Sequence, residues 1–242
     1  HVLITTMASL LSAETIPAYL EERAQEIGLF PPGAVLTVQP ITGGNVNFAY
    51  QVTEVATGET CFVKQAPEYV AIFGPEGLPL TSARMQQEMD VYARWRSILG
   101  PEKSKQYLPQ IYLFDNVNMV FVMEFLEGCE LLDRELVASG AVSAQVAVGL
   151  GEFLGLTHGA THQSKVPPDE ATELAASFEN RPMRDVQLEY VFSKCYAEAP
   201  AAGKLRANRG FMAEVEQLKR SYDGKDPEVR GSSAATTART PR

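Results

Sequence analysis

Residues 43–66 read GGNVNFAYQVTEVATGETCFVKQA, and this stretch decides the fold. It opens with two glycines and continues as two runs rich in β-branched and aromatic residues, 46–53 and 60–66, with turn residues at 56–59 between them. A run of the same character precedes it at residues 35–39. Short runs of this kind, separated by turn signals, predict three antiparallel strands.

The sequence after this stretch predicts a helix and a second pair of strands. Residues 81–99 repeat apolar side chains at the spacing of one helix face, namely Met85, Met89, Tyr92, Trp95 and Leu99. Residues 110–114 and 119–125 predict two more strands around the turn at 115–118. Together with an amphipathic helix expected over Ile16–Ile27, the pattern indicates one five-stranded antiparallel sheet with a helix packed on it.

Beyond Gly128 the pattern is helical, with segments expected around 146–154, 171–178, 183–196 and 211–222. A sheet-rich part followed by a helical part predicts a two-lobe α+β chain. We therefore expect an N-terminal extension at 1–12, a first lobe at 13–124, a partial helical lobe at 125–222 and a tail at 223–242. The tail is poor in large apolar residues, so we expect it to be disordered. The start of the protein is either His1 or Met7, and in the second case residues 1–6 lie upstream of it.

Composition excludes several classes of function. The net charge of -9 and the pI near 5.0 disfavour nucleic acid as a partner. No apolar run is long enough to predict a membrane span. The three cysteines, Cys61, Cys129 and Cys195, are widely spaced and fit neither a disulfide framework nor a zinc site, which favours a cytoplasmic location.

A glycine-rich segment lies between the first two predicted strands, where Gly43-Gly44-Asn45-Val46-Asn47-Phe48 stands. Glycines there allow the backbone to approach a phosphate and to present N–H groups to it. The alternative is a plain hairpin turn.

Lys64 is a lone cation in the apolar run 61–66, and ATP phosphates would supply the counter-charge that it needs. Glu88 falls on the inward stripe of the predicted helix. The two resemble the strand lysine and helix glutamate that position phosphates in kinase-type phosphotransferases. The alternatives are a solvated edge strand for Lys64 and the flank of the stripe for Glu88.

The segment Glu124, Phe125 and Leu126 follows the last predicted strand. In the order glycine loop, lysine strand, helix with an inward acid and strand pair, this segment is expected to be an inter-lobe hinge whose backbone groups receive adenine. The alternative is the end of a buried strand.

Four motifs, taken in order, resemble the methylthioribose kinase family, within the aminoglycoside phosphotransferase and choline kinase group. They are residues 43–50, residues 63–70, residues 78–81 with Arg84 and Glu88, and residues 108–115. The resemblance runs from about residue 10 to residue 222 and is most specific between Gly43 and Asp115. It departs from the family pattern at Gly77-Leu78, where a tryptophan usually precedes the Pro-Leu-Thr run.

The resemblance implies a bilobal protein-kinase-like fold and transfer of the ATP γ-phosphate to the 1-hydroxyl of 5-methylthioribose, in methionine salvage, with Mg²⁺. It implies that Gly43, Gly44, Asn45, Asn47 and Phe48 cover the phosphates and that Lys64 binds them. Glu88 would hold Lys64, and Glu124 to Leu126 would meet adenine. A homodimer would suit the family.

The family's His-Gly-Asp catalytic loop is absent from the 242 residues, so we assign no catalytic base and no metal ligand. Asp226-Pro227-Glu228 imitates a magnesium motif but stands in the Gly/Ser/Thr-rich tail, which favours coincidence. We therefore expect a chain truncated before its catalytic loop. The alternatives are a non-catalytic nucleotide-binding or interaction module, an unstable fragment of a larger enzyme, and another kinase of the same group.

Overall fold

The computed structural model describes residues 9–224. The chain divides into two compact units, with the boundary between Glu179 and Asn180. The predicted tail at 223–242 lies outside the described part from residue 225 onward, including its Asp226-Pro227-Glu228 run, and so do the predicted upstream residues 1–6. The lobe boundary expected at residues 124 and 125 falls inside the first unit and stays a prediction.

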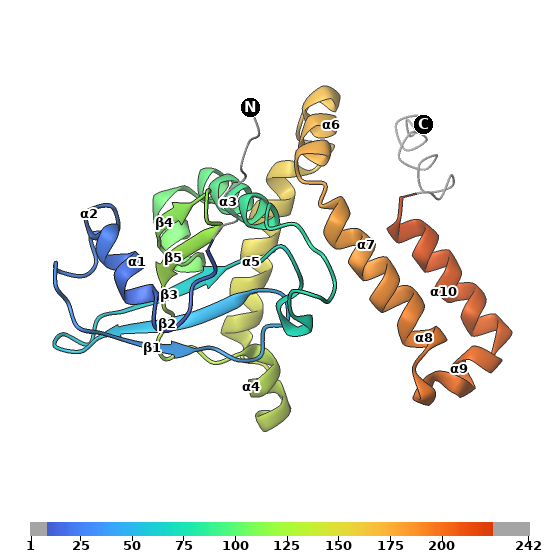
Figure 1. The fold of residues 1–242 in the computed structure, drawn as a ribbon. Helices are drawn as coiled ribbons and strands as arrows, with labels where there is room; N and C mark the ends of the chain where they lie inside the picture. Colours follow the sequence, from blue (N-terminus) through green and yellow to red (C-terminus); the bar gives the residue numbers. More distant parts are fainter. Residues whose placement is uncertain (1–8, 225–242) are drawn as a thin grey trace, which may run out of the picture. The chain divides into compact units, whose positions relative to one another are not determined.

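The first unit is built on one five-stranded antiparallel sheet (Figure 1). Its strands are β1 (Leu36–Pro40), β2 (Phe48–Glu54), β3 (Thr60–Gln65), β4 (Ile111–Asp115) and β5 (Val120–Glu124). They are ordered β1-β2-β3-β5-β4, so β3 lies at the centre. The predicted α+β class and the predicted sheet are confirmed.

The second strand begins two residues later than the pattern predicts. Residues 46 and 47 are β-branched or polar and fit a strand by composition, but β2 starts at Phe48. The backbone at this point pairs elsewhere, because the carbonyls of Asn45 and Val46 accept from the amides of Ile72 and Ala71. A backbone group that is already bonded to another segment is not available to the ladder.

Helices cover both faces of the sheet. Helices α1 (Ile16–Glu22) and α2 (Ala24–Ile27) pack on one face, where the buried residues are Ile16, Tyr19, Leu20, Val52, Cys61, Val63, Val120 and Val122. The sequence predicts one helix here, but the backbone leaves the helical region at Arg23, with φ -111° and ψ 13°. Gly28, with φ 63°, then ends α2.

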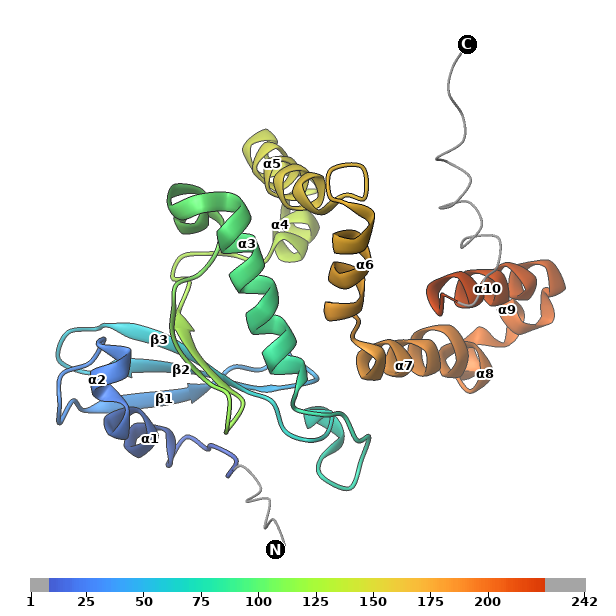
Figure 2. The ribbon, with the colours of Figure 1, turned by 90° about the horizontal axis from the view of Figure 1, so that it is seen from above.

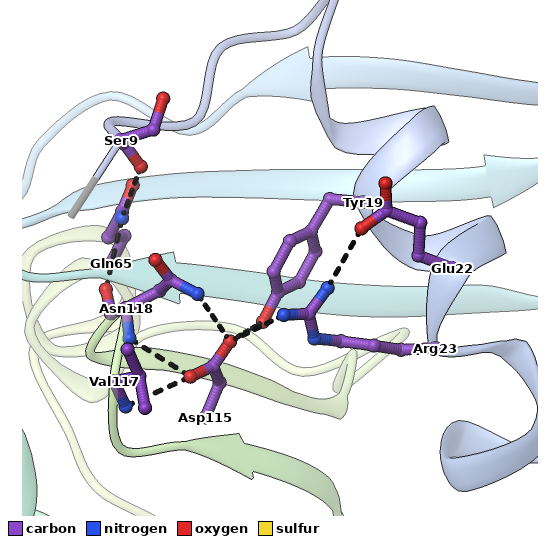
Figure 3. A network of polar contacts seen from close by, with 8 residues as sticks. All are labelled: Ser9, Tyr19, Glu22, Arg23, Gln65, Asp115, Val117 and Asn118. Carbon is purple, nitrogen blue, oxygen red and sulfur yellow. Dashed lines mark hydrogen bonds and ion pairs between the residues drawn. The ribbon is translucent and has the colours of Figure 1, made fainter. Parts of the chain in front are cut away.

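A polar network fixes α1 to the hairpin between β4 and β5 (Figure 3). The Asp115 carboxylate accepts from the Tyr19 hydroxyl at 3.0 Å and from the Arg23 guanidinium at 3.1 Å. It also accepts from the backbone of Val117 and from the backbone and side chain of Asn118. Arg23 thus bonds to Asp115 at the residue where the helix is interrupted.

The long helix α3 (Arg84–Tyr107) packs on the opposite face of the sheet (Figure 2). Its side of the core contains Ala66, Met85, Phe121 and Met123, with Phe62, Met89 and Tyr92 packed against them. The helix is predicted over 81–99 and confirmed, although it begins at Arg84. At Gly100, with φ 70° and ψ 175°, the chain kinks before Pro101 and then resumes as helix to Tyr107.

Three further helices complete the first unit: α4 (Leu132–Ser139), α5 (Ala144–Thr161) and α6 (Pro168–Ser177), and a short 3₁₀ turn, η1 (Ala71–Phe73), precedes α3. Phe153 of α5 contacts Trp95 and Tyr107 of α3, with ring centroids 5.1 and 5.7 Å apart. Several other apolar residues of α5 are exposed, and Val148 retains 71% of its accessible surface. A helix that is apolar all round is ordinarily buried, so this face is unusual for a surface helix.

The second unit is entirely helical. It contains α7 (Arg181–Glu189), a π turn η2 (Tyr190–Lys194), α8 (Cys195–Ala197), η3 (Pro200–Ala202), α9 (Gly203–Ala207) and α10 (Arg209–Tyr222). Phe192 packs on Tyr222, and Tyr196 packs on Phe211. Of the predicted apolar stripe on α10, Val215 is buried, whereas Leu218 is exposed. Across residues 9–224, no helix combines the length and the apolar character that crossing a membrane requires.

Candidate functional site

The structure brings Lys64 and Glu88 into direct contact. The Lys64 Nζ lies 2.6 Å from one carboxylate oxygen of Glu88 and 2.7 Å from the other. Lys64 comes from β3 and Glu88 from the second turn of α3, so two elements far apart in sequence meet on the helix-covered face of the sheet. Both side chains are partly exposed, at 21% and 30%, so a ligand can still reach the ammonium group.

Alternation along β3 explains why Lys64 points toward α3. Cys61 and Val63 are buried against α1 and α2, and the neighbouring Phe62 and Lys64 therefore face the opposite side. Because β3 is the central strand, a solvated edge strand is the wrong interpretation of Lys64. The lysine is held in a defined position by its partner glutamate instead of extending freely into water.

The glycine-rich segment lies next to this pair. In the β2–β3 register Lys64 is opposite Ala49, one residue inside the start of β2, so the loop before Phe48 lies at the same end of the sheet as the lysine. Gly43 has φ 109°, a conformation that favours glycine, and open space surrounds the position of a Cβ at both Gly43 and Gly44. The loop joins two antiparallel strands, and its far end is fastened at residues 45 and 46.

The predicted hinge lies at the end of β5, where the chain passes from the core to the surface. Val120 to Met123 are buried, Glu124 is exposed, Phe125 is half-buried and Leu126 is exposed. The Glu124 amide donates to the Gln110 carbonyl at 2.7 Å, and its carboxylate accepts from the Gln110 amide at 2.9 Å. These bonds tie the start of the segment to the chain that enters β4.

An open cavity of about 690 Å³ lies beside the hinge segment. It is lined by residues of the second half of α3 and by the ends of β4 and β5, including Arg96, Lys105, Gln110 and Glu124. None of its lining residues belongs to the glycine loop, and neither Lys64 nor Glu88 is among them. The structure therefore joins Lys64, Glu88 and the loop in one place, and does not join the hinge to them through this cavity.

Sequence reasoning missed one residue of this region. Arg84 belongs to a motif of the resemblance, but no role followed from that. Its guanidinium is buried and donates to Asn47 Oδ1 and to the Val46 carbonyl in the glycine loop. Its spacing of four residues before Glu88 was the available signal, because residues at i and i+4 share one face of a helix.

No group of three or more His, Cys, Asp or Glu side chains is arranged to hold a metal ion within residues 9–224. A bound magnesium ion typically takes one or two protein carboxylates together with phosphate oxygens and water. A site of that kind needs no group of three, so the magnesium ligands stay unassigned.

Comparison with known proteins gives one consistent family of relatives. The chain is 29% identical to a methylthioribose kinase from Geobacillus sp. (strain WCH70) over 170 residues, which are 70% of this chain and 41% of the relative. It is 28% identical to methylthioribose kinases from Escherichia coli O45:K1, over 78% of this chain and 44% of the relative, and from Klebsiella pneumoniae (strain 342), over 85% and 47%. The chain thus spans less than half the length of each of these relatives.

The other two comparisons concern family models and solved structures. No family model matches the chain. Among solved structures, a Plasmodium vivax ethanolamine kinase aligns with 89% of this chain and 53% of its own, at 15% identity and a TM-score of 0.43. The resemblance to methylthioribose kinases predicted from the sequence motifs is confirmed by the sequence relatives.

Proposed function

We propose that this chain carries the ATP-binding part of a small-molecule kinase. The observation that supports the proposal is the contact between Lys64 and Glu88 at the end of the sheet where the glycine-rich loop begins. A lysine that is oriented by a helix glutamate beside such a loop is the arrangement with which kinase-type enzymes grip phosphates. The names of the sequence relatives agree with this chemistry.

In this proposal each element has a separate task toward ATP. The Lys64 ammonium neutralises phosphate charge, and Glu88 keeps it from rotating away. Backbone N–H groups of Gly43 to Phe48 donate to phosphate oxygens. Backbone groups of Glu124 to Leu126 receive the adenine.

We further propose 5-methylthioribose as the acceptor, phosphorylated at its 1-hydroxyl in methionine salvage, because the relatives are named methylthioribose kinases. Mg²⁺ would accompany the nucleotide, as it does in phosphoryl transfer generally. Since no ligand set for it is identified among residues 9–224, we derive no step through the metal and assign no catalytic base.

A second candidate function is a nucleotide-binding or interaction module that does not transfer the phosphate. The observation that favours it is the Lys64–Glu88 contact beside the glycine-rich loop, which can hold phosphates without supplying a base for transfer. The two proposals share the nucleotide site and differ only in turnover.

Calorimetric titration with a non-hydrolysable ATP analogue, AMPPNP, tests the shared site. We expect saturable binding by the chain, and a loss of about tenfold or more in affinity for Lys64→Ala, which corresponds to about 1.4 kcal/mol. Lys165→Ala is the matched control, because Lys165 is exposed in a loop. It takes part in none of the ion pairs of residues 9–224. No binding by the wild-type chain, or equal losses for the two variants, would contradict the proposal.

Turnover separates the two functions. ADP release in the presence of ATP, Mg²⁺ and 5-methylthioribose would support the kinase, with choline and an aminoglycoside as competing acceptors. If AMPPNP binds but none of the three acceptors is phosphorylated by the chain, the module without transfer is favoured. Phosphorylation of choline or an aminoglycoside alone would move the chain elsewhere in the same group.

A further inference from the structure

The Arg84 guanidinium is buried beneath the glycine-rich loop, with only 7% of the residue exposed. An arginine carries five N–H donors in a rigid fork, and the five contacts of Arg84 account for all of them. Nε donates to Asn47 Oδ1 at 2.9 Å, Nη1 to the carbonyls of Leu80 and Thr81 at 2.8 and 2.7 Å, and Nη2 to the carbonyls of Val46 and Tyr69 at 3.1 and 3.4 Å.

All five acceptors are neutral. No carboxylate of the described chain forms an ion pair with Arg84, although Glu68 lies near enough to favour its charge. Burial lowers the pKa of Arg84 through desolvation, and Glu68 opposes this effect. Burying a charge whose only partners are carbonyl oxygens costs free energy. We therefore expect Arg84 to have a role that a neutral side chain cannot fulfil.

The acceptors belong to two different segments of the chain. Val46 and Asn47 are in the glycine loop, whereas Tyr69, Leu80 and Thr81 frame the segment 69–81 that leads into α3. Tyr69 and Pro79 form an isolated β-bridge, which closes this segment at its base. Arg84 therefore fastens the loop to a closed neighbouring segment, and the amides of Ala71 and Ile72 add two further bonds to the same loop.

The position of Arg84 on α3 adds a connection to Lys64. Arg84 and Glu88 are one turn apart on the same helix, so one turn holds the glycine loop and the next holds Lys64. With all its donors engaged, Arg84 has none left for a phosphate. Its effect on a nucleotide must therefore act through the loop.

We infer that Arg84 is a positioning residue that fixes the glycine loop relative to Lys64, so that both reach the same phosphate chain. This inference rests on the proposed ATP site. It predicts that loss of the fork weakens binding of the phosphates specifically and leaves binding of the nucleoside unchanged. A lysine cannot replace it, because a single ammonium group has three donors and no planar fork.

The test compares Arg84→Lys with the wild-type chain by calorimetry, using AMPPNP and adenosine as separate ligands. We expect AMPPNP affinity to fall about tenfold while adenosine affinity stays within about twofold. Arg206→Lys is the matched control, because Arg206 also donates to two backbone carbonyls, those of Tyr196 and Ala199, but in the second unit. A folded Arg84→Lys chain that binds AMPPNP as tightly as the wild type would overturn the inference and leave the proposed function standing.

Amide hydrogen exchange in the unliganded chain gives a second readout that does not depend on ATP. We expect exchange at the amides of Ala71 and Ile72, which donate to the loop carbonyls of Val46 and Asn45, to accelerate at least tenfold in Arg84→Lys. A smaller acceleration is expected in Asn47→Ala, which removes one acceptor and serves if the first variant does not fold. Unchanged exchange in a folded variant would overturn the inference. If the wild-type chain binds no AMPPNP, the proposed function fails. The exchange experiment alone then tests whether Arg84 fixes the glycine loop.

Discussion

Lys64 and Glu88 are 24 residues apart in sequence, yet the lysine Nζ contacts both carboxylate oxygens, at 2.6 and 2.7 Å. The contact joins the central strand of the sheet to the helix that covers it. A partly exposed ion pair of this kind contributes little to stability, in the range of about 0–1 kcal/mol. The contact of the ammonium group with both carboxylate oxygens is better explained as a means of orienting Lys64 than as a contribution to stability.

Glu88→Gln tests that explanation. The amide keeps the size of the side chain but loses its charge, so the Lys64 ammonium is no longer held in one orientation. We expect AMPPNP affinity to fall about tenfold in calorimetry, while the free energy of unfolding in urea changes by less than about 1 kcal/mol. Glu102→Gln is the control, since Glu102 is an exposed residue on the same helix. A large loss of stability with unchanged affinity would show that the pair is structural.

The Asp115 network gives a prediction about pH. Burial alone would raise the pKa of Asp115, but hydrogen bonds from Asn118, Tyr19 and the Val117 amide favour the ionised form and hold the pKa below its ordinary value. A lowered pKa in the folded state means that the carboxylate stabilises the fold above the pKa of the unfolded chain. This stabilisation is lost as the pH falls through the folded pKa.

We therefore expect the free energy of unfolding to decrease as the pH drops below about 4, with part of that decrease missing in Asp115→Asn. At pH 7 the variant should be less stable by about 1–3 kcal/mol, because the Tyr19 hydroxyl and the Arg23 guanidinium lose a charged acceptor. Urea unfolding at several pH values measures both effects. Asp169→Asn, at an exposed position in α6, is the control. Parallel pH profiles for wild type and Asp115→Asn would contradict the assignment.

The strands and the long helix could be predicted because their signals are local. Residues 48–53 and 60–65 are rich in β-branched and aromatic residues between turn signals, and residues 85–99 repeat at helical spacing, so each segment alone indicates its own structure. The contact between Lys64 and Glu88 could be predicted from the order of the elements and from the spacing of the residues along them. A lysine on a sheet strand and a glutamate on the inward face of the helix that covers the sheet are placed to face each other.

The departures from prediction arise from contacts between distant segments. β2 starts late because residues 45 and 46 bond to residues 71 and 72, and the first helix is interrupted at Arg23, whose guanidinium bonds to Asp115. The chain leaves the helical conformation at Gly100, as the Gly-Pro pair indicates, and the helical stretch that follows to Tyr107 is not predicted. The burial of Arg84 depends on carbonyls from three separate stretches, and no periodicity in the sequence reports where a carbonyl points.

Gly77 provides a last test of the segment that holds the glycine loop. Its amide donates to the Gly74 carbonyl at 3.0 Å, which closes a tight turn, and a Cβ added at residue 77 would overlap the Cβ and the carbonyl oxygen of Phe73. The turn cannot accept a larger side chain at residue 77 without moving Phe73.

We expect Gly77→Ala to lower the free energy of unfolding by about 1–3 kcal/mol, as overpacking typically does. Because Phe73 directly follows Ile72, whose amide bonds to the Asn45 carbonyl, the displaced turn should also loosen the glycine loop and weaken AMPPNP binding severalfold. Gly151→Ala is the control, because a Cβ there meets no atom within 4 Å in the interior of α5 and should stabilise that helix by about 0.5–1 kcal/mol. Equal effects of the two substitutions on urea unfolding and on binding would show that the turn at Gly77 does not support the loop.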